Sequence, residues 1–186
     1  MYTVKNFLVT GRPGVGKTTC IMRIVSLLRE KGRSVDGFIT REERRGNRRV
    51  GFKIVSLGDN KEDYLASIWF RDGPRVGKYV VNLKALESIG VKAIIRALEA
   101  SDVIVIDEIG PMELFSSIFQ DEVLKALDSK KAVLASIHFK ASRYPFSRKI
   151  LERKDIRIYE LKVVNRETIY LKIARDILET LNILSK

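Results

Sequence analysis

One segment near the amino terminus restricts what this chain can fold into more than any other. Residues 11–18 read GRPGVGKT and satisfy the pattern G-x-x-x-x-G-K-[ST] at every fixed position. The pattern works only between a strand and a helix. Here the apolar run 6–10 predicts a buried strand, and the spacing of apolar residues over 17–31 predicts an amphipathic helix. The segment is therefore interpreted as a phosphate-binding loop.

The residue types of this loop predict its chemistry. Its glycines let the backbone turn tightly and direct N–H groups toward one point, where the helix N-terminus adds partial positive charge. Lys17 is expected to reach the β- and γ-phosphates of a nucleoside triphosphate, and the Thr18 hydroxyl to ligate Mg²⁺. Pro13 stiffens the loop.

A second segment supplies acidic groups. Residues 103–106 are four consecutive β-branched apolar residues, which predict a strand buried on both faces, and Asp107 and Glu108 follow directly. The carboxyl ends of parallel strands form the edge where α/β folds bind ligands. We expect Asp107 to act on the metal ion, directly or through water. Glu108 is expected to polarise a water for attack on the γ-phosphate, which favours hydrolysis over transfer to a bulky acceptor.

Strand and helix patterns alternate along the chain, which predicts an α/β fold with a mostly parallel central sheet flanked by helices. The stretch 37–57 differs: strand-like ends flank REERRGNRR, which predicts an inserted antiparallel hairpin. Its tip is expected to carry arginines as a solvated face: Arg41, Arg44, Arg45, Arg48 and Arg49. Further strands are expected at 65–70, 132–137 and 156–163. Further helices are expected at 83–100, 117–127 and 146–153, and after Asn165. Asn82 is a candidate N-cap and Gly90 a candidate break.

Composition narrows the setting. The 186 residues favour one domain, 1–186, and no apolar run approaches the roughly 20 residues needed to cross a bilayer. The amino terminus lacks the features of a secretory signal. The single cysteine, Cys20, cannot form an intrachain disulfide and is expected to be a buried helix residue. These features predict a cytoplasmic protein with no membrane partner.

The net charge of +12, from 35 Lys and Arg against 23 Asp and Glu, allows two interpretations. A basic surface binds nucleic acid through counterion release. A highly charged surface with one Gln, one Cys and three Met is also typical of thermophilic proteins. The thermophilic surface with a polyphosphate substrate is favoured, and nucleic acid remains an open partner.

Three further side chains are candidates for the site. His138, the only histidine, follows the strand expected at 132–137 and could sense the γ-phosphate if that strand neighbours the 103–106 strand. The alternative is a structural role. Arg143 and Arg148 lie in FKASRYPFSRK and could close over phosphate, with plain surface charge as the alternative.

Taken together, these segments resemble the small nucleoside triphosphatases first described from thermophiles, whose vertebrate members are called cancer-related nucleoside triphosphatases. The resemblance spans essentially the whole chain. It rests on TGRPGVGKTT, GFITREERRGNRRVGFKIVSL, GKYVV, DEIGPME and the pair Asn165–Arg166.

The resemblance implies a RecA-like P-loop fold and Mg²⁺-dependent hydrolysis of nucleoside triphosphates to diphosphate and phosphate, with broad base tolerance. Two segments would contact the nucleotide. The first comprises Gly11, Arg12, Pro13, Gly14, Val15, Gly16, Lys17 and Thr18. The second comprises Val103, Ile104, Val105, Ile106, Asp107, Glu108, Ile109 and Gly110.

Three hypotheses follow. The leading one is a hydrolase of ATP, GTP, CTP and UTP, with Lys17 and Glu108 as catalytic residues and Thr18 and Asp107 as metal ligands. The second is a kinase for a small acceptor, with the Arg143–Arg148 stretch as a lid. The third is a nucleic-acid-stimulated ATPase that uses the hairpin arginines. Oligomeric state, physiological substrate and the source of any transition-state arginine stay open.

Overall fold

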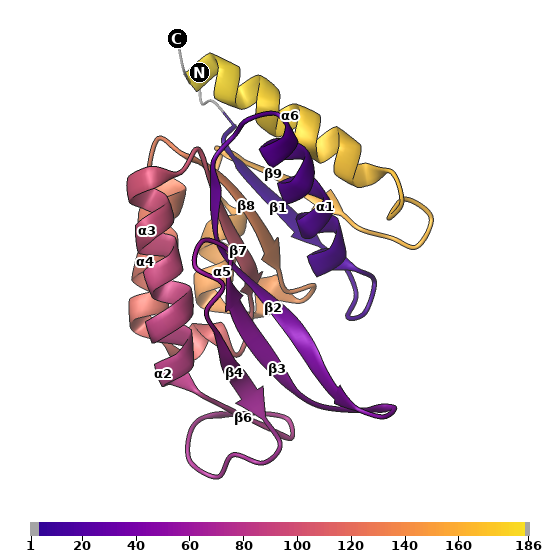
Figure 1. The fold of residues 1–186 in the computed structure, drawn as a ribbon, viewed down its shortest axis with the longest axis vertical. Helices are drawn as coiled ribbons and strands as arrows, with labels where there is room; N and C mark the ends of the chain where they lie inside the picture. Colours follow the sequence, from indigo (N-terminus) through magenta and orange to yellow (C-terminus); the bar gives the residue numbers. More distant parts are fainter. Residues whose placement is uncertain (1–3, 185–186) are drawn as a thin grey trace.

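Residues 4–184, which the computed structural model describes, form a nine-stranded mixed sheet with helices on both faces (Figure 1). The strand order is β5-β6-β4-β3-β2-β7-β8-β1-β9. The strands are β1 (Asn6–Thr10), β2 (Val35–Arg45), β3 (Arg48–Ser56), β4 (Glu62–Ser67), β5 (Arg75–Val76), β6 (Tyr79–Val81), β7 (Val103–Ile109), β8 (Ala132–Ile137) and β9 (Ile156–Glu160). The main helices are α1 (Lys17–Glu30), α2 (Leu83–Ala85), α3 (Lys92–Ala100), α4 (Ser117–Asp128), α5 (Pro145–Leu151) and α6 (Ile169–Leu184).

One half of the sheet is parallel. Strands β2, β7, β8, β1 and β9 pair in that order, each parallel to the next. Their apolar runs are buried on both faces, as in β8, where all six residues are buried. The predicted alternation of strands and helices is confirmed. Because these strands are parallel, their carboxyl ends meet at one edge, with β8 between β1 and β7.

The other half is antiparallel and larger than the predicted hairpin. Strands β2 and β3 pair from Phe38↔Ser56 to Arg45↔Arg48, and β4, β6 and β5 extend the sheet beyond them. The arginines expected at a hairpin tip lie instead on the strands themselves, because the turn consists only of Gly46 and Asn47. The strand expected at 65–70 begins earlier, at Glu62, and β5 and β6 were not predicted.

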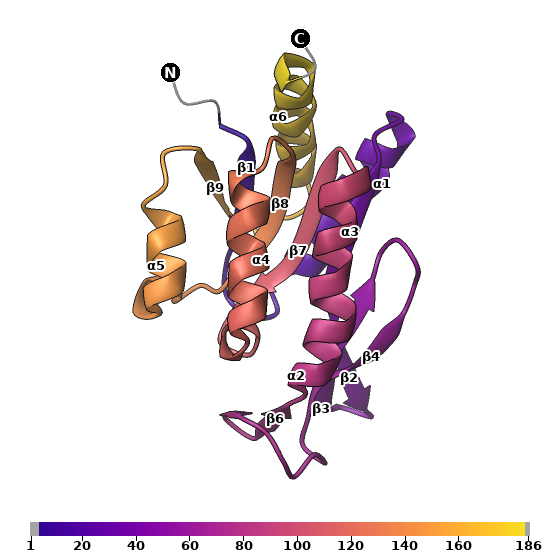
Figure 2. The ribbon, with the colours of Figure 1, turned by 90° about the vertical axis from the view of Figure 1, so that its left-hand side faces the viewer.

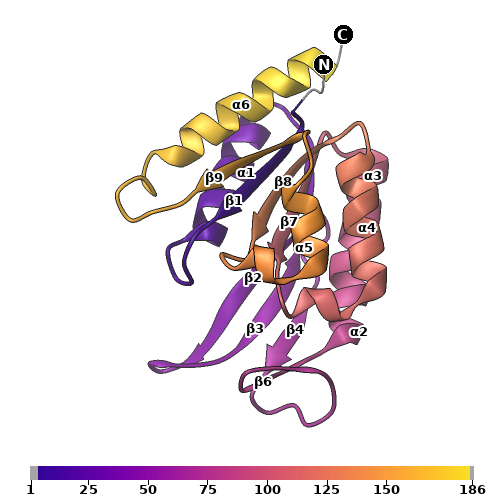
Figure 3. The same ribbon diagram turned by 180° about the vertical axis from the view of Figure 1, so that it is seen from behind.

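The helices form two layers. Helices α1 and α6 bury apolar faces in one core cluster, and α3, α4 and α5 bury theirs in the other. Figure 2 shows the sheet between these layers, and Figure 3, from behind, shows α5 in front of the sheet and α1 beyond it. Cys20 lies buried in α1, as expected, and burial raises the pKa of its thiol to about 11. None of the helices within 4–184 is long and apolar enough to cross a bilayer.

The helix predicted at 83–100 stays helical through Gly90. Asn82 caps its start, since its Oδ1 accepts a hydrogen bond from the Ala85 N–H at 3.1 Å. After α2 the chain continues as a π-helical segment, Leu86–Val91, and then as α3. A Cβ atom on Gly90 would lie 2.7 Å from Cδ1 of Ile54, so the glycine lets this segment pack closely on β3.

The end of the chain differs in detail from the prediction. The strand expected at 156–163 ends at Glu160, and α6 begins at Ile169 rather than directly after Asn165. The Asn165 side chain accepts a hydrogen bond from Lys162 N–H at 2.8 Å, so it stabilises the turn after β9. The helix itself is amphipathic as expected, with Ile173, Ile177 and Leu181 buried.

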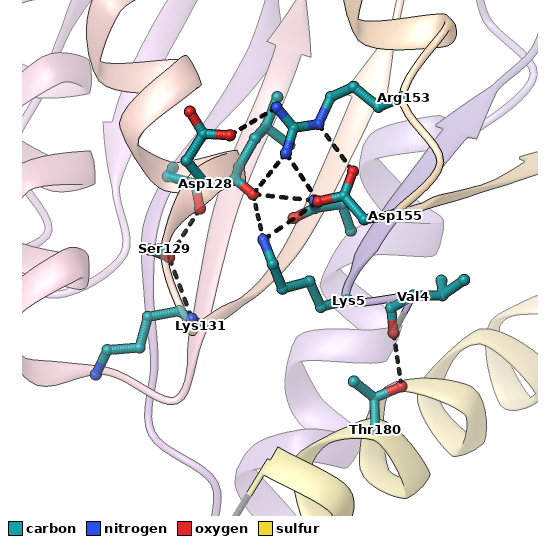
Figure 4. A network of polar contacts seen from close by, with 11 residues as sticks. Val4, Lys5, Asp128, Ser129, Lys131, Arg153, Asp155 and Thr180 are labelled. Atoms are coloured by element: carbon teal, nitrogen blue, oxygen red, sulfur yellow. Dashed lines mark hydrogen bonds and ion pairs between the residues drawn. The ribbon is translucent and has the colours of Figure 1, made fainter. Parts of the chain in front are cut away.

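A charged network closes the amino end of the parallel strands (Figure 4). Asp155 forms an ion pair with Arg153 at 2.8 Å and another with Lys5 at 3.5 Å. Arg153 also pairs with Asp128 at 2.7 Å, and both Arg153 and Lys5 donate to the Leu127 carbonyl. The network ties the start of β1 to the end of α4 and the start of β9. It lies at the edge of the sheet opposite the phosphate loop.

Candidate active site

The predicted phosphate-binding loop lies between β1 and α1, as its pattern requires. Gly14 and Gly16 have φ angles of +76° and +105°, a region that side-chain-bearing residues rarely adopt. Gly16 directly precedes the first helical residue, Lys17. The loop thus presents backbone N–H groups and the positive end of α1 to the carboxyl edge of the sheet. The Lys17 ammonium lies over the loop, 3.4 Å from the Gly11 carbonyl oxygen.

The end of β7 meets this loop through Asp107. The Thr18 hydroxyl donates to Asp107 Oδ2 at 2.7 Å, and the Ser136 hydroxyl donates to Oδ1. Asp107 is 1% exposed, and burial raises the pKa of its carboxyl, against the opposing effect of these hydrogen bonds. Ser136 comes from β8, the strand that separates β1 from β7. The two predicted metal ligands are therefore adjacent, and the intervening strand holds one of them in place.

Two more carboxyl groups lie just beyond Asp107. A Cβ atom on Gly110 would be 3.2 Å from Glu108 Oε1 and 3.2 Å from Glu113 Oε2, so both side chains lie on the same side of Gly110. Glu108 Oε1 is buried and has no protein hydrogen-bond partner. Burial raises the pKa of Glu108, opposed by the charge of Lys17. Burial, followed by the charge of Glu108, raises the pKa of Glu113 to about 8.

A cleft of about 790 Å³ connects these groups. The phosphate loop and Glu108 line one part of it, and the antiparallel strands line the other. From the predicted set, the lining includes Pro13, Gly14, Gly16, Lys17, Thr18, Glu108 and His138. A cleft of this volume has room for more than a triphosphate group.

A smaller cleft of about 500 Å³ lies on the other side of the loop. It shares Pro13 and Gly14 with the large cleft and adds Arg12 and Val15 from the loop. The opposite wall follows β9 and contains Glu160, Leu161, Lys162, Val163 and Arg166. The phosphate loop therefore separates two clefts along the same edge of the sheet.

The remaining predicted residues lie differently. Val103, Ile104, Val105, Ile106 and Ile109 are each fully buried in the core, where they place Asp107 and Glu108 at the sheet edge. Strand β8 does neighbour β7, so His138 reaches the large cleft; burial and then the charges of Lys17 and Lys140 lower its pKa. Arg143 and Arg148 are exposed, and neither lines the cleft in this structure.

Sequence reasoning missed several residues of the site. In the sequence, Glu113 stands out only as part of DEIGPME, and Ser136 only as part of an apolar strand. The sequence predicts a solvated face for Arg41, Arg44 and Arg49, yet all three line the large cleft. The signal for Ser136 was a polar residue inside a strand otherwise buried on both faces. For the arginines, strand alternation gives no such signal, because Arg41, Glu42 and Arg44 all line the cleft and the β2–β3 pairing shifts register between Glu43 and Arg44.

The site fits a magnesium ion. Magnesium prefers oxygen ligands and is usually held by one or two protein groups together with substrate phosphates. The Thr18 hydroxyl and Asp107 carboxylate offer such a pair beside the phosphate loop. Within residues 4–184 there is no cluster of three or more His, Cys, Asp or Glu side chains of the kind that holds a metal without a substrate.

Comparison with known proteins gives a consistent family assignment. The model of a family described as NTPase matches residues 6–174. A protein named nucleoside-triphosphatase THEP1 from Thermofilum pendens is 51% identical over 93% of this chain and 95% of its own length. A protein of the same name from Thermotoga maritima is 49% identical over 87% of this chain and 89% of its own.

Two solved structures share the fold. THEP1 from the hyperthermophile Aquifex aeolicus superposes with a TM-score of 0.79 at 33% identity, covering 90% of this chain and 96% of that one. A human cancer-related nucleoside triphosphatase superposes with a TM-score of 0.80 at 34% identity, covering 94% and 98%. The resemblance inferred from the sequence motifs and the predicted α/β fold are both confirmed.

Proposed function

The chain belongs to the NTPase family, and from that membership we propose that it is an Mg²⁺-dependent nucleoside-triphosphate phosphohydrolase that releases the γ-phosphate of ATP, GTP, CTP and UTP. Membership of this family supports the enzyme class, a nucleoside triphosphatase. The Mg²⁺ requirement, the substrates and the residue roles are supported by the geometry of the cleft.

One observation carries the hydrolase proposal. Glu108 Oε1 is a buried carboxylate oxygen without a protein hydrogen-bond donor. Glu108 directly follows Asp107, the residue that accepts a hydrogen bond from Thr18. A buried acceptor of this kind is costly to keep unless it serves a ligand. An attacking water would supply the donor. The same oxygen is then placed to take the proton that this water loses.

The chain's groups divide the chemical step between them. The loop N–H groups and Lys17 bind the β- and γ-phosphate oxygens. Thr18 and Asp107 would hold a magnesium ion, which would neutralise phosphate charge when bound. Glu108 orients a water so that its oxygen bonds to the γ-phosphorus as the bond to the bridging oxygen breaks. The water proton passes to Glu108, and the bridging oxygen leaves with the nucleoside diphosphate.

Base tolerance follows from where recognition occurs. The loop binds phosphates, which all nucleotides share. The smaller cleft is the space next to the loop on the side away from β7, and we place the sugar and base there. Its lining contains three long basic side chains, Arg12, Lys162 and Arg166. It also contains apolar Val15 and Leu161. Such a lining stacks on a base without reading its hydrogen-bonding edge.

Phosphate release tests this proposal. The purified chain is assayed with ATP, GTP, CTP and UTP, each with Mg²⁺ and with excess EDTA, and with and without added RNA. We expect release from all four triphosphates, with kcat/KM values within about tenfold of one another. EDTA is expected to abolish release and RNA to leave it unchanged. Absence of Mg²⁺-dependent release, or release that requires RNA, would contradict the proposal.

A further inference from the structure

The order of strands along the carboxyl edge sets out ligand positions in a row. From one side to the other, the edge carries the loop after β9, the phosphate loop after β1, the end of β8, the end of β7 with Asp107 and Glu108, and then β2 and β3. The small cleft lies between the first two positions, and the large cleft spans the rest. The γ-phosphate, next to Glu108, would thus lie in the middle of this row rather than at its end.

Beyond Glu108, the large cleft is bounded by a basic wall. Arg41, Arg44 and Arg49 line it, with Glu42 as the one acidic residue among them on the hairpin. Glu42 pairs with Arg49 at 2.5 Å and with Arg44 at 3.0 Å. Two of the three guanidinium groups thus share one carboxylate, and with Arg41 the wall keeps a positive excess. Guanidinium groups bind phosphate through paired N–H donors, so this wall suits a phosphate monoester.

The floor of the same half is apolar and aromatic. It contains Phe52, Leu65, Val76, Tyr79 and Met112. The rings of Phe52 and Tyr79 meet edge to face, with centroids 5.2 Å apart. Arg49 links wall and floor, because its Nε donates to the Tyr79 hydroxyl at 3.0 Å and its guanidinium lies 5.0 Å from the centroid of Phe52. Part of this aromatic surface lines the cleft beside Arg49, where a flat ring can pack.

The nucleoside triphosphate itself does not fill this half under the proposed function. Asp107, Thr18 and Glu108 fix the γ-phosphate on the β7 side of the loop, so the α-phosphate and sugar extend the other way, toward β9 and the small cleft. The half of the large cleft between Glu108 and the hairpin is then left for another molecule. Of the two clefts described, only this half of the large one combines a positive charge, an aromatic floor and a position close to the γ-phosphate.

We propose that this half of the cleft, formed by the hairpin arginines and the Phe52–Tyr79 floor, is a binding site for a second ligand, a ring-bearing phosphate monoester such as a nucleoside monophosphate. The proposal rests on the proposed function, because it takes the triphosphate to lie on the β9 side of Glu108. The phosphate of the second ligand lies against Arg44 and Arg49, and its ring lies on Phe52 and Tyr79.

Calorimetric titration of the loaded protein tests the site. The full chain is saturated with Mg²⁺ and the non-hydrolysable β,γ-imido analogue of ATP, and then titrated with AMP and UMP. The corresponding nucleosides and inorganic phosphate are titrated in parallel. We expect one further site for the monophosphates, with a dissociation constant at least about tenfold below those for the nucleosides and for phosphate, since ring and phosphate both contribute.

Matched arginine variants locate the site. Arg44→Ala and Arg49→Ala should each weaken monophosphate binding roughly ten- to a hundredfold. Arg49→Lys, which keeps the charge but loses the planar fork and the bond to Tyr79, should fall between. Arg48→Ala removes the same charge from the same hairpin at an exposed position outside the cleft, and should change the affinity less than about twofold. Circular dichroism verifies that each variant is folded.

Two results would overturn the inference. One is the absence of any monophosphate site on the loaded wild-type chain. The other is that Arg49→Ala weakens the imido analogue and leaves monophosphate binding unchanged, which would assign this half of the cleft to the base of the triphosphate. Failure of the imido analogue to bind would reject the proposed function instead. In that case titrating the monophosphates into the free chain and its arginine variants still decides the second site.

Discussion

The two edges of the parallel strands differ in how their charged side chains are paired. At the amino edge, Lys5, Asp155 and Arg153 are joined by ion pairs and by hydrogen bonds to a backbone carbonyl (Figure 4). At the carboxyl edge, Glu108 and Glu113 share the surroundings of Gly110, and burial raises the pKa of each. At the amino edge, the charged groups are paired with one another within the protein. At the carboxyl edge, these two carboxyl groups lack such partners within residues 4–184, and a bound ligand would supply them. Perturbed, incompletely paired charges are typical of functional sites.

Replacing one lysine at each edge should separate these roles most strongly. Lys17→Ala removes the cation at the phosphate loop, and we expect kcat/KM for ATP to fall at least about a thousandfold, because electrostatic stabilisation of the transition state is usually the largest catalytic term. Lys5→Ala is the matched control at the amino edge. It should keep kcat/KM within about twofold while lowering the free energy of unfolding. Phosphate release gives kcat/KM and guanidinium unfolding gives the free energy of unfolding for each variant. An active Lys17→Ala protein would contradict the assignment of catalysis to the carboxyl edge.

Glu108→Gln tests the carboxyl edge more finely. The amide keeps the shape of the side chain but cannot accept a proton, so kcat should fall about a hundredfold, within the 10²–10⁴ range of general-base contributions. Affinity for a fluorescent ATP analogue should change little. Glu122→Gln, on α4 away from the cleft, makes the same exchange as a control and should keep full turnover. Near-normal turnover in Glu108→Gln would remove Glu108 from the mechanism.

The parts of the site that the sequence predicted are those encoded by short, continuous segments. The phosphate loop follows from a fixed spacing of glycines and Lys17 between a strand and a helix, and the position of Asp107 and Glu108 follows from an uninterrupted β-branched run. The boundaries of β1 and β8 were predicted residue for residue. In each case local sequence and tertiary position agree, because a doubly buried strand can occupy only the centre of the sheet.

The parts that could not be predicted depend on which segments become neighbours. Ser136 reaches Asp107 only because β8 lies between β1 and β7, an order that no local pattern specifies. Arg49 faces the cleft because β2 and β3 pair up to a two-residue turn, with a register shift between Glu43 and Arg44. The amino-edge network likewise joins Lys5 to Leu127 and Asp155, both more than 100 positions away. Charged residues in such positions look like ordinary surface charge in the sequence.

The two edges should also respond to pH in opposite directions. The folded pKa of Glu113 is raised from 4.5 to about 8, so the stability present below pH 4.5 is lost as the pH rises toward 8, when only the unfolded chain has released the proton. Burial acts to raise the pKa of Asp155, but the bond to Arg153 and the charges of Arg153 and Lys5 lower it overall. Asp155 therefore adds stability above its unfolded pKa, and that stability is lost as the pH falls through its folded pKa.

Glu113→Gln measures the contribution of the carboxyl edge to this difference. The amide cannot ionise, so the variant should gain stability relative to wild type between pH 5 and pH 8, on the order of 3 kcal/mol, given about 1.4 kcal/mol per pKa unit. Guanidinium unfolding of the nucleotide-free proteins at several pH values provides the measurement. Asp155→Asn should show the opposite trend, with its deficit relative to wild type shrinking as the pH falls. Parallel stability curves for wild type and Glu113→Gln would contradict the assignment.

Arg153→Ala should give the smallest effect, confined to stability. The guanidinium binds both oxygens of Asp155, the Leu127 carbonyl and Asp128, yet its side chain is 23% exposed, so water compensates part of the loss. We expect about 1–2 kcal/mol of destabilisation in guanidinium unfolding, with kcat and KM unchanged. Arg153→Lys should recover part of this, because an ammonium restores one ion pair but not the fork.

The outcome for Arg153 bears on both edges at once. Its network contacts the first residues of β1 and β9, whose other ends lead into the phosphate loop and the wall of the small cleft. If strand packing isolates the edges, Arg153→Ala lowers the unfolding free energy and leaves catalysis intact, as interactions between distant sites are usually additive. A fall in kcat/KM of tenfold or more would instead mean that the amino edge positions the loop through β1. The charges at the two edges would then form one coupled system.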